Sequence, residues 1–285
     1  MQFTRNIMHM NVSYKKECDK NMKRYFLFVL SFLLFCYIST AVPTQFNTTT
    51  DLSRSDINDW MTPTMVVSLY AYNDSSVYLG LENGLFGVYN PITNVTTNLE
   101  DSDQNNWLSE ISNNHVQAWS GMNNTAIFMA GWNGILGYYN QETNISHNLR
   151  ESDPGNWIGS TRAANDIYDM IVVNRTHAYF AMEGGKFGVY VANTNTSYNL
   201  NDSDPGNWVG TNKWDAITFT DSSTIFLGVN NGYFAIFNAS NNVSSNLSET
   251  DINNWIGTSI IRDIIAYNST HVYIVNDNGG FGVYD

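Results

Sequence analysis

One short phrase recurs five times along the chain and constrains its fold more than any other feature. It reads DINDW, DQNNW, DPGNW, DPGNW and DINNW, and its tryptophans are separated by 47, 50, 51 and 47 residues. A glycine-aromatic phrase, such as NGLFGVY or GGKFGVY, recurs with the same period. Self-similarity at a fixed period of about 20–50 residues is the signature of repeat architectures. The five tryptophans are Trp60, Trp107, Trp157, Trp208 and Trp255.

Each unit is predicted to contain four short strands. In the first unit these are residues 66–72, 77–81, 85–89 and 95–99, which are rich in β-branched and aromatic residues. Asn83-Gly84, between the second and third segments, is the signature of a two-residue type I′ hairpin. No segment has the periodicity of a helix. Four antiparallel strands in a unit of about 40–50 residues are typical of a β-propeller blade.

The two ends of the repeat array predict how the ring closes. The last unit stops at Asp285, directly after its third strand, whereas FNTTTDL (46–52) resembles the fourth strands ITNVTTNL and ETNISHNL. A strand from the N-terminus that completes the last blade would remove the unpaired sheet edges of an open array. We therefore predict an all-β fold: a five-bladed β-propeller with four antiparallel strands per blade, closed by the N-terminal strand.

These residues resemble two groups of known propellers. The phrase VYLGLENGLFGVY resembles the sensor-type regulator-propeller repeat, and the five-blade count is similar to that of tachylectin-type lectins. The resemblance covers residues 45–285 and is one of architecture, so it implies a fold and transfers no ligand residue. Propellers include enzymes, lectins and scaffolds alike, so the function has to be argued from a site.

The first 41 residues differ in character from the repeats. Six of the 13 basic residues lie within residues 1–24, before the apolar run 25–38 and the small residues that end at Ala41. This pattern predicts a signal peptide, or alternatively an uncleaved signal anchor, over residues 1–41 and an exported propeller over 42–285. Either reading places the propeller on the non-cytoplasmic side, so it is secreted or lies at the extracellular face of a membrane. Both cysteines, Cys18 and Cys36, lie in the leader, so the propeller can form no disulfide.

The net negative charge of the chain excludes some classes of binding partner and favours others. Its net charge is −13, and without residues 1–41 it has 7 Lys+Arg against 24 Asp+Glu, or −17. Such a chain is a poor ligand for nucleic acid or anionic membranes, so membrane association is expected only through an uncleaved anchor. Neutral glycans and cationic proteins are favoured partners, and no cofactor is expected other than a weakly favoured Ca²⁺ ion, which takes oxygen ligands. The oligomeric state is left open.

The repeated tryptophans and aspartates have two readings. They could form five ligand sites, or they could be a packing wedge and a turn cap that every blade needs. We also expect the aspartates to form an acidic ring on the crossover face. They lie four residues before each tryptophan, at Asp56, Asp103, Asp153, Asp204 and Asp251.

Glycosylation sequons recur in two columns of the repeat. One precedes the fourth strand, at Asn47, Asn94, Asn144, Asn195 and Asn242. The other lies in the turn between the first and second strands, at Asn73, Asn123, Asn174 and Asn268, and the fourth blade has Asp221 there. Both columns are predicted on one face of the propeller, which leaves the crossover-loop face free for a partner. Asn and Thr also suit turns without any glycan, and that reading stays open.

Two columns at the start of the innermost strand vary between units and therefore supply the candidate ligand residues. The first column reads Val67, Gln117, Tyr168, Asp215 and Arg262, and the second reads Ser68, Ala118, Asp169, Ala216 and Asp263. The polar members are Gln117, Tyr168, Asp169, Asp215, Arg262 and Asp263, which we predict to converge at the mouth of the central channel. The alternative is a hydrated channel with an ion pair between Arg262 and Asp215.

The leading interpretation is a non-catalytic recognition module that binds a glycan or a protein through its crossover-loop face, because a regular repeat leaves no blade specialised for catalysis. One alternative is a glycoside hydrolase that uses two channel carboxylates such as Asp169 and Asp263. A purely structural surface or virion protein is another. No histidine pair has metal-ligand spacing, and no G-x-S-x-G motif occurs.

Overall fold

The structure is a computed structural model of the chain, and it describes residues 60, 64–101, 103, 105, 107–108, 115–123, 125–152, 158, 165–201, 214–248 and 255–285. All of them belong to one unit that spans Leu52–Asp285. The leader 1–41 and the predicted closing strand 46–52 lie outside the described residues. No helix among the described residues is long and apolar enough to span a bilayer.

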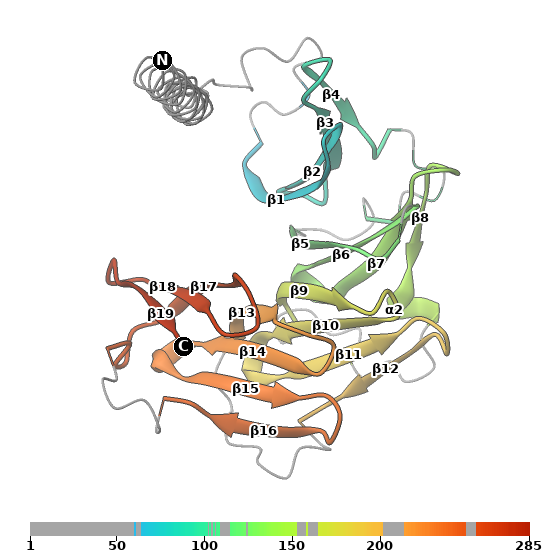
Figure 1. Ribbon diagram of the computed structural model, residues 1–285. Coiled ribbons are helices and arrows are strands. Elements are labelled where there is room, and N and C mark those ends of the chain that lie inside the picture. The colour runs from blue at the N-terminus through green and yellow to red at the C-terminus, as the bar shows by residue number, and fades with distance from the viewer. Residues whose placement is uncertain are drawn as a thin grey trace, which may run out of the picture. The chain divides into compact units, whose positions relative to one another are not determined.

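The described residues form five small antiparallel sheets in chain order, which we call blades 1 to 5 (Figure 1). Blade 1 contains β1 (Val66–Asn73), β2 (Ser76–Leu81), β3 (Phe86–Asn90) and β4 (Val95–Asn98). Blade 2 contains β5 (Val116–Gly121), β6 (Ala126–Gly131), β7 (Ile135–Asn140) and β8 (Ile145–Asn148). Blade 3 contains β9 (Ile167–Val173), β10 (His177–Met182), β11 (Phe187–Val191) and β12 (Thr196–Asn199).

Blade 4 contains β13 (Trp214–Phe219), β14 (Thr224–Val229), β15 (Phe234–Asn238) and β16 (Val243–Asn246), and blade 5 contains β17 (Ile261–Ala266), β18 (Val272–Asn276) and β19 (Phe281–Tyr284). The only helical segments among the described residues are single turns: α2 (Leu149–Ser152), η1 (Trp132–Gly134), η2 (Glu183–Gly185) and η3 (Asn230–Gly232). The prediction of an all-β, five-bladed propeller is confirmed.

Each sheet is a simple meander whose first strand is innermost. The innermost strands contact one another in chain order, β1 with β5, β5 with β9, β9 with β13, and β13 with β17. Asn83 and Gly84 have φ of 63° and 75°, the left-handed backbone that the predicted type I′ hairpin between β2 and β3 requires. Blade 5 has three described strands, so the outer edge of β19 is where a fourth strand would pair.

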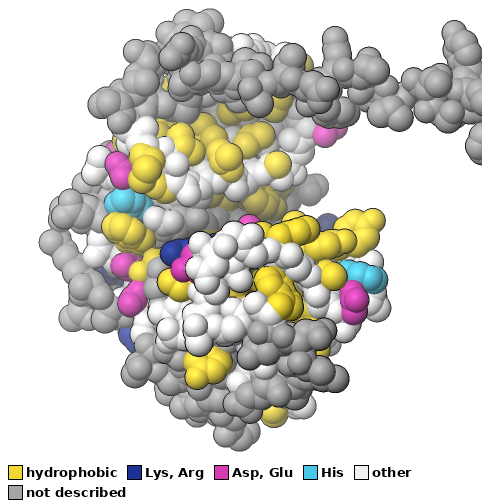
Figure 2. Space-filling view, turned by 90° about the vertical axis from the view of Figure 1, so that its left-hand side faces the viewer, with side chains coloured by type: hydrophobic (Ala, Val, Ile, Leu, Met, Phe, Trp, Pro, Cys, Tyr) yellow, Lys and Arg dark blue, Asp and Glu magenta, His cyan; other side chains and the backbone are white. Residues whose placement is uncertain are grey.

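The hydrophobic core lies between neighbouring blades. Four separate clusters of buried side chains join blades 1 and 2, 2 and 3, 3 and 4, and 4 and 5. Among the described residues, no such cluster joins blade 5 to blade 1. Large hydrophobic side chains are instead exposed on these two blades, and we call them the seam residues: Met65, Val66 and Leu69 on blade 1, and Ile265, Tyr267, Phe281 and Val283 on blade 5. In Figure 2, hydrophobic side chains gather on the walls of a hollow on this side of the domain.

The repeated tryptophan is a packing wedge. A Cβ added to Gly137 on β7 would lie 2.5 Å from the Trp107 ring, and one added to Gly87 on β3 would lie 2.3 Å from Trp60. Trp255 sits in the same way over Gly282 on β19. The glycine of the aromatic phrase therefore makes room for the indole of the crossover before the same blade. This geometry supports the packing reading for these three tryptophans, while Trp157 and Trp208 lie outside the described residues.

Candidate functional site

A cavity of about 500 Å³ lies among the innermost strands of all five blades. It is lined by all six of the predicted ligand residues, Gln117, Tyr168, Asp169, Asp215, Arg262 and Asp263, together with Val67, Ser68, Leu69 and Trp132. Residues from five units of the repeat, up to 196 positions apart in sequence, thus meet at one place. We call it the channel cavity. Their role as ligand residues remains a prediction.

A β-bulge places the first of the two variable columns. In blade 1, Val66 pairs with Leu81 and Ser68 pairs with Gly80, so Val67 has no partner in the ladder. The same register shift occurs at the start of the innermost strand in every blade. The five bulged residues are Val67, Gln117, Tyr168, Asp215 and Arg262, and all of them line the cavity. A bulge re-aims a side chain and relaxes the pairing constraint, which explains why this column can vary between blades.

The second column connects blades to one another. One carboxylate oxygen of Asp169 accepts the backbone N–H of Met170 at 2.8 Å, and the other accepts that of Ile217 on β13 at 2.9 Å. In blade 1 the Ser68 hydroxyl plays a comparable part, because it donates to the Val116 carbonyl on β5. Asp169 therefore links blade 3 to blade 4. The corresponding Asp263 accepts its own neighbour's N–H, from Ile264 at 2.8 Å.

The polar side chains of the channel cavity differ in whether they form hydrogen bonds or ion pairs with other described residues. The Tyr168 hydroxyl donates to Glu183 of η2 at 2.5 Å, and burial together with this bond raises the pKa of Tyr168. Arg262 is exposed, and its guanidinium forms no ion pair or hydrogen bond with any residue in the described part of the chain. The alternative of an Arg262–Asp215 ion pair is therefore not seen among the described residues.

Burial raises the pKa of Asp169 to about 7, against the two backbone N–H bonds that lower it, and the nearby Asp263 carboxylate raises it further. The Asp169 carboxyl therefore binds a proton more tightly in the folded protein than in the unfolded chain, where the pKa of Asp is near 3.8. The resulting stability is fully present below pH 4 and is lost as the pH rises towards 7.

We expect Asp169 to lower the free energy of unfolding by a few kcal/mol between pH 4 and pH 7. Urea unfolding at several pH values measures how the free energy of unfolding changes with pH. This change should be smaller in the Asp169→Asn variant. Equal changes in the two proteins would contradict the assignment.

The repeated aspartate does not form an exposed acidic ring at the one position where it is described. Asp103 is buried, with 6% of its surface exposed. Its carboxylate accepts the backbone N–H of Ser146 on β8 at 2.8 Å and that of Asn105 at 3.2 Å, and it also binds the Ser146 hydroxyl. The expectation of an exposed acidic residue is wrong for Asp103, because it caps the crossover turn and ties it to the outer strand of blade 2. The other four aspartates lie outside the described residues.

The sequon asparagines also shape the turns in which they lie. Asn94, Asn144, Asn195 and Asn242 all have positive φ, between 51° and 55°. In blades 1 to 3 the side chain of this asparagine accepts a hydrogen bond from the third-strand tyrosine, at 2.7–3.0 Å.

In the other column, the side-chain oxygen of Asn123 accepts the N–H and hydroxyl of Thr125, as Asn73 and Asn268 do with Ser75 and Thr270. Asp221, which is no sequon, makes the same bonds to Ser223, and these backbone and side-chain bonds lower its pKa. The Asx turn thus gives Asn73, Asn123 and Asn268 a structural role that needs no glycan. Asn174, in contrast, has a left-handed backbone with φ of 55° and makes none of these bonds among the described residues.

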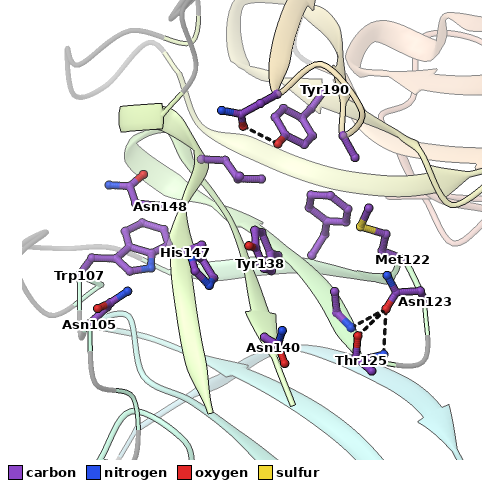
Figure 3. A pocket seen from close by; sticks show the side chains of 15 residues that line it. Asn105, Trp107, Met122, Asn123, Thr125, Tyr138, Asn140, His147, Asn148 and Tyr190 are labelled. Carbon is purple, nitrogen blue, oxygen red and sulfur yellow. Dashed lines mark hydrogen bonds between the residues drawn. The ribbon is translucent and has the colours of Figure 1, made fainter. Parts of the chain in front are cut away.

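Sequence reasoning missed a second, larger concavity. A groove of about 960 Å³ runs along blade 2 where it faces blade 3, and we call it the flank groove. Figure 3 shows Tyr138 and His147 side by side in it, with Trp107, Asn140 and Asn148 around them. The signal was present as another variable column. The pair that reads Tyr138–His147 in blade 2 reads Val88–Thr97 in blade 1.

Comparison with known proteins shows the fold alone. No protein-family model matches the chain, and no curated protein matches it. Among solved structures, the extracellular domain of BT4673 from B. thetaiotaomicron, described as a hybrid two component system, superposes with a TM-score of 0.55 at 14% identity. The match covers 77% of this chain and 26% of that one.

The Cps50 (Swd1) beta-propeller domain of Myceliophteria thermophila matches with a TM-score of 0.53 at 13% identity, over 75% of this chain and 64% of that chain. The computationally designed Ika8 protein gives a TM-score of 0.52 at 13% identity, over 77% of this chain and 57% of its own. The chain thus spans about a quarter of the BT4673 domain and less than two thirds of the other two. The predicted propeller architecture is confirmed by these matches.

Proposed function

We propose that residues 42–285 form an exported, non-catalytic recognition module that binds a glycan or a protein at the channel cavity, on the crossover-loop face. The observation that carries this proposal is the set of five bulges. Each blade directs one residue that its ladder does not need into a shared cavity, and these five residues all differ in chemistry. A ring built from near-identical blades requires no such diversity, whereas recognition of an asymmetric ligand does.

The chemistry of the cavity suits an uncharged or weakly charged polar ligand. It combines an amide (Gln117), a phenol (Tyr168), carboxylates and one guanidinium that is not paired with a described residue. Trp132, from the hairpin between β6 and β7, adds an aromatic surface and stacks on His115 with ring centroids 3.9 Å apart. Among the described residues, no three His, Cys, Asp or Glu side chains are grouped to hold a metal ion, so the weakly favoured Ca²⁺ ion gains no support.

Export and glycosylation are part of the same proposal. Export is supported by the basic and apolar leader. Glycosylation is supported by the turn positions of the sequons, since seven of the eight described asparagines in the two columns are exposed and Asn195 is half-buried. The sensor-domain neighbour is described as extracellular, in line with an exported module.

A hydrolase is the second candidate, because Asp169 and Asp263 line one cavity and the pKa of Asp169 is raised to about 7. The hydrogen bonds favour recognition instead. Both oxygens of Asp169 are held by backbone N–H groups, so its carboxyl is not presented to a glycosidic oxygen in the way that a general acid requires. Release of nitrophenol from a panel of nitrophenyl glycosides, lost in Asp169→Asn, would support the hydrolase.

The test of the recognition proposal is a binding screen of the exported protein against arrayed glycans and extracellular proteins. We expect Arg262→Ala and Tyr168→Ala each to weaken the binding of the best hit by about tenfold or more, because each removes a polar contact of about 1.5 kcal/mol. The thermal midpoint should change little in Arg262→Ala, whose side chain is exposed, and should fall by a few degrees in Tyr168→Ala, which also loses the hydrogen bond to Glu183. Val67→Ala, at the same bulge in blade 1, is the matched control. Unchanged affinity in both variants would place the ligand elsewhere.

A further inference from the structure

The flank groove contains an aromatic platform. Tyr138 on β7 and His147 on β8 are cross-strand partners, and their rings stack at a centroid distance of 4.4 Å and an interplanar angle of 18°. Both side chains are half-buried, so one side of the pair is open to the groove. Tyr190 and Asn195 of blade 3 line the groove as well. Figure 3 shows the two rings in the middle of the concavity.

This platform is particular to blade 2. The same cross-strand position reads Val88–Thr97 in blade 1, Val189–Tyr198 in blade 3 and Ile236–Ser245 in blade 4. The repeat therefore folds with small or aliphatic residues at the position of Tyr138. A stacked aromatic pair is an addition that the propeller itself does not need.

The polar groups around the platform are uncharged. None of the described residues that line the groove is Asp, Glu, Lys or Arg. The side-chain oxygens of Asn140 and Asn148 accept backbone N–H groups, of Glu142 and Arg150 among others, and their amide N–H groups have no partner among the described residues. The groove thus offers a flat aromatic surface flanked by amide donors, with no carboxylate, ammonium or guanidinium group among its described lining residues.

We propose that the flank groove binds a neutral carbohydrate, with one pyranose ring on the Tyr138–His147 pair. A pyranose has an apolar face of C–H groups and a rim of hydroxyls, so it matches an aromatic surface edged by amides, whereas an ionic ligand finds no Asp, Glu, Lys or Arg partner among the described lining residues. This inference is independent of the function proposed for the channel cavity, because the two concavities share no residue.

Two sources could supply such a sugar. Asn123 and Asn195, both in sequons, line the groove, so an N-linked glycan of the chain itself would begin at its rim. A free glycan is the other source. The shared chemistry is a neutral sugar on the aromatic pair, and glycosylated and unglycosylated preparations separate the two cases.

The experiment measures binding of N,N′-diacetylchitobiose and cellotetraose to the full chain by calorimetry and saturation-transfer NMR. The chain is produced once in a host that does not N-glycosylate and once in a host that does. We expect at least one neutral sugar to bind the unglycosylated chain, and sialyllactose, an anionic probe, to bind at least tenfold more weakly. If glycosylation blocks the binding and endoglycosidase treatment restores it, the occupant is the chain's own glycan. If glycosylation leaves it unchanged, the occupant is a free glycan.

The decisive variant is Tyr138→Val combined with His147→Thr, which installs the pair that blade 1 already has. It should lower affinity by tenfold or more while the thermal midpoint changes little, and Tyr138→Phe should retain both binding and stability. An unglycosylated chain that binds neither neutral sugar would overturn the proposal. So would a double variant that binds as tightly as the wild type.

Discussion

Removal of residues 45–52 is expected to lower the free energy of unfolding by about 4 kcal/mol, and with it the thermal midpoint by roughly 8–16 °C. In blades 1 to 4 the fourth strand completes the ladder and its last leucine is buried, as Leu99 is in blade 1 at 6% exposure. Burial of one leucine contributes about 1.5–3 kcal/mol, and each ladder hydrogen bond contributes about 1 kcal/mol. If residues 46–52 supply the strand that β19 lacks, their loss leaves the outer edge of β19 unpaired.

The matched control is Leu52→Ala measured beside Leu99→Ala, because the two residues occupy the same column. Similar losses of stability would show that residues 46–52 act as a fourth strand. A peptide of residues 44–52, added to the truncated protein, should restore part of the lost midpoint by pairing with the free edge of β19. A truncated protein that melts within a degree or two of the full chain, and does not aggregate, would refute closure by this strand.

The sequence was sufficient for the architecture because the repeat carries its own internal comparison. Five copies of each column separate the residues that every blade needs from those that vary. The tryptophan at the position of Trp107 recurs in all five units and the glycine at the position of Gly137 in four, with Ala235 in blade 4, and an indole lies over this glycine in blades 1, 2 and 5. Gln117 and Tyr168 vary because they occupy bulges outside the ladder. The variable columns therefore predicted which residues converge, although the bulge that brings them together could not be read from one strand alone.

Features that depend on pairs of strands were not predictable in the same way. The column of Tyr138 varies between blades, but the flank groove also depends on the register that sets Tyr138 opposite His147, and no single column reports the register between β7 and β8. The sequence offers two readings of Asp103, a turn cap and a member of an acidic ring, and the structure shows the cap. Its burial depends on Ser146, 43 residues later, which presents a backbone N–H and a hydroxyl to it. The Asx turns could not be distinguished from glycosylation sites by sequence, because an Asn-x-Thr sequence is compatible with both.

Trp107→Ala is expected to cost about 3–5 kcal/mol of unfolding free energy, the range for deleting a buried large aromatic side chain. The ring is 8% exposed and belongs to the cluster that joins blades 1 and 2, where it lies with Phe86 and Leu108. The matched control is Trp132→Ala, whose ring is half-buried in the channel cavity and belongs to no interblade cluster among the described residues. Its loss should cost about 1 kcal/mol, since much less apolar surface is removed from the interior.

A double-mutant cycle with Gly137 tests the wedge directly. Gly137→Ala alone should cost about 1–3 kcal/mol, because the new methyl group would lie 2.5 Å from the indole and 2.6 Å from the backbone carbonyl oxygen of His147. In the Trp107→Ala background the clash with the ring is gone, but the methyl group still lies 2.6 Å from the backbone carbonyl oxygen of His147, so the cost of Gly137→Ala should fall without vanishing. The coupling free energy between the two sites is then at least about 1 kcal/mol. If Gly137→Ala were equally costly with and without the indole, the glycine would be required for its backbone and not for the ring, and the recurrence of tryptophan and glycine at one period would need a different physical cause.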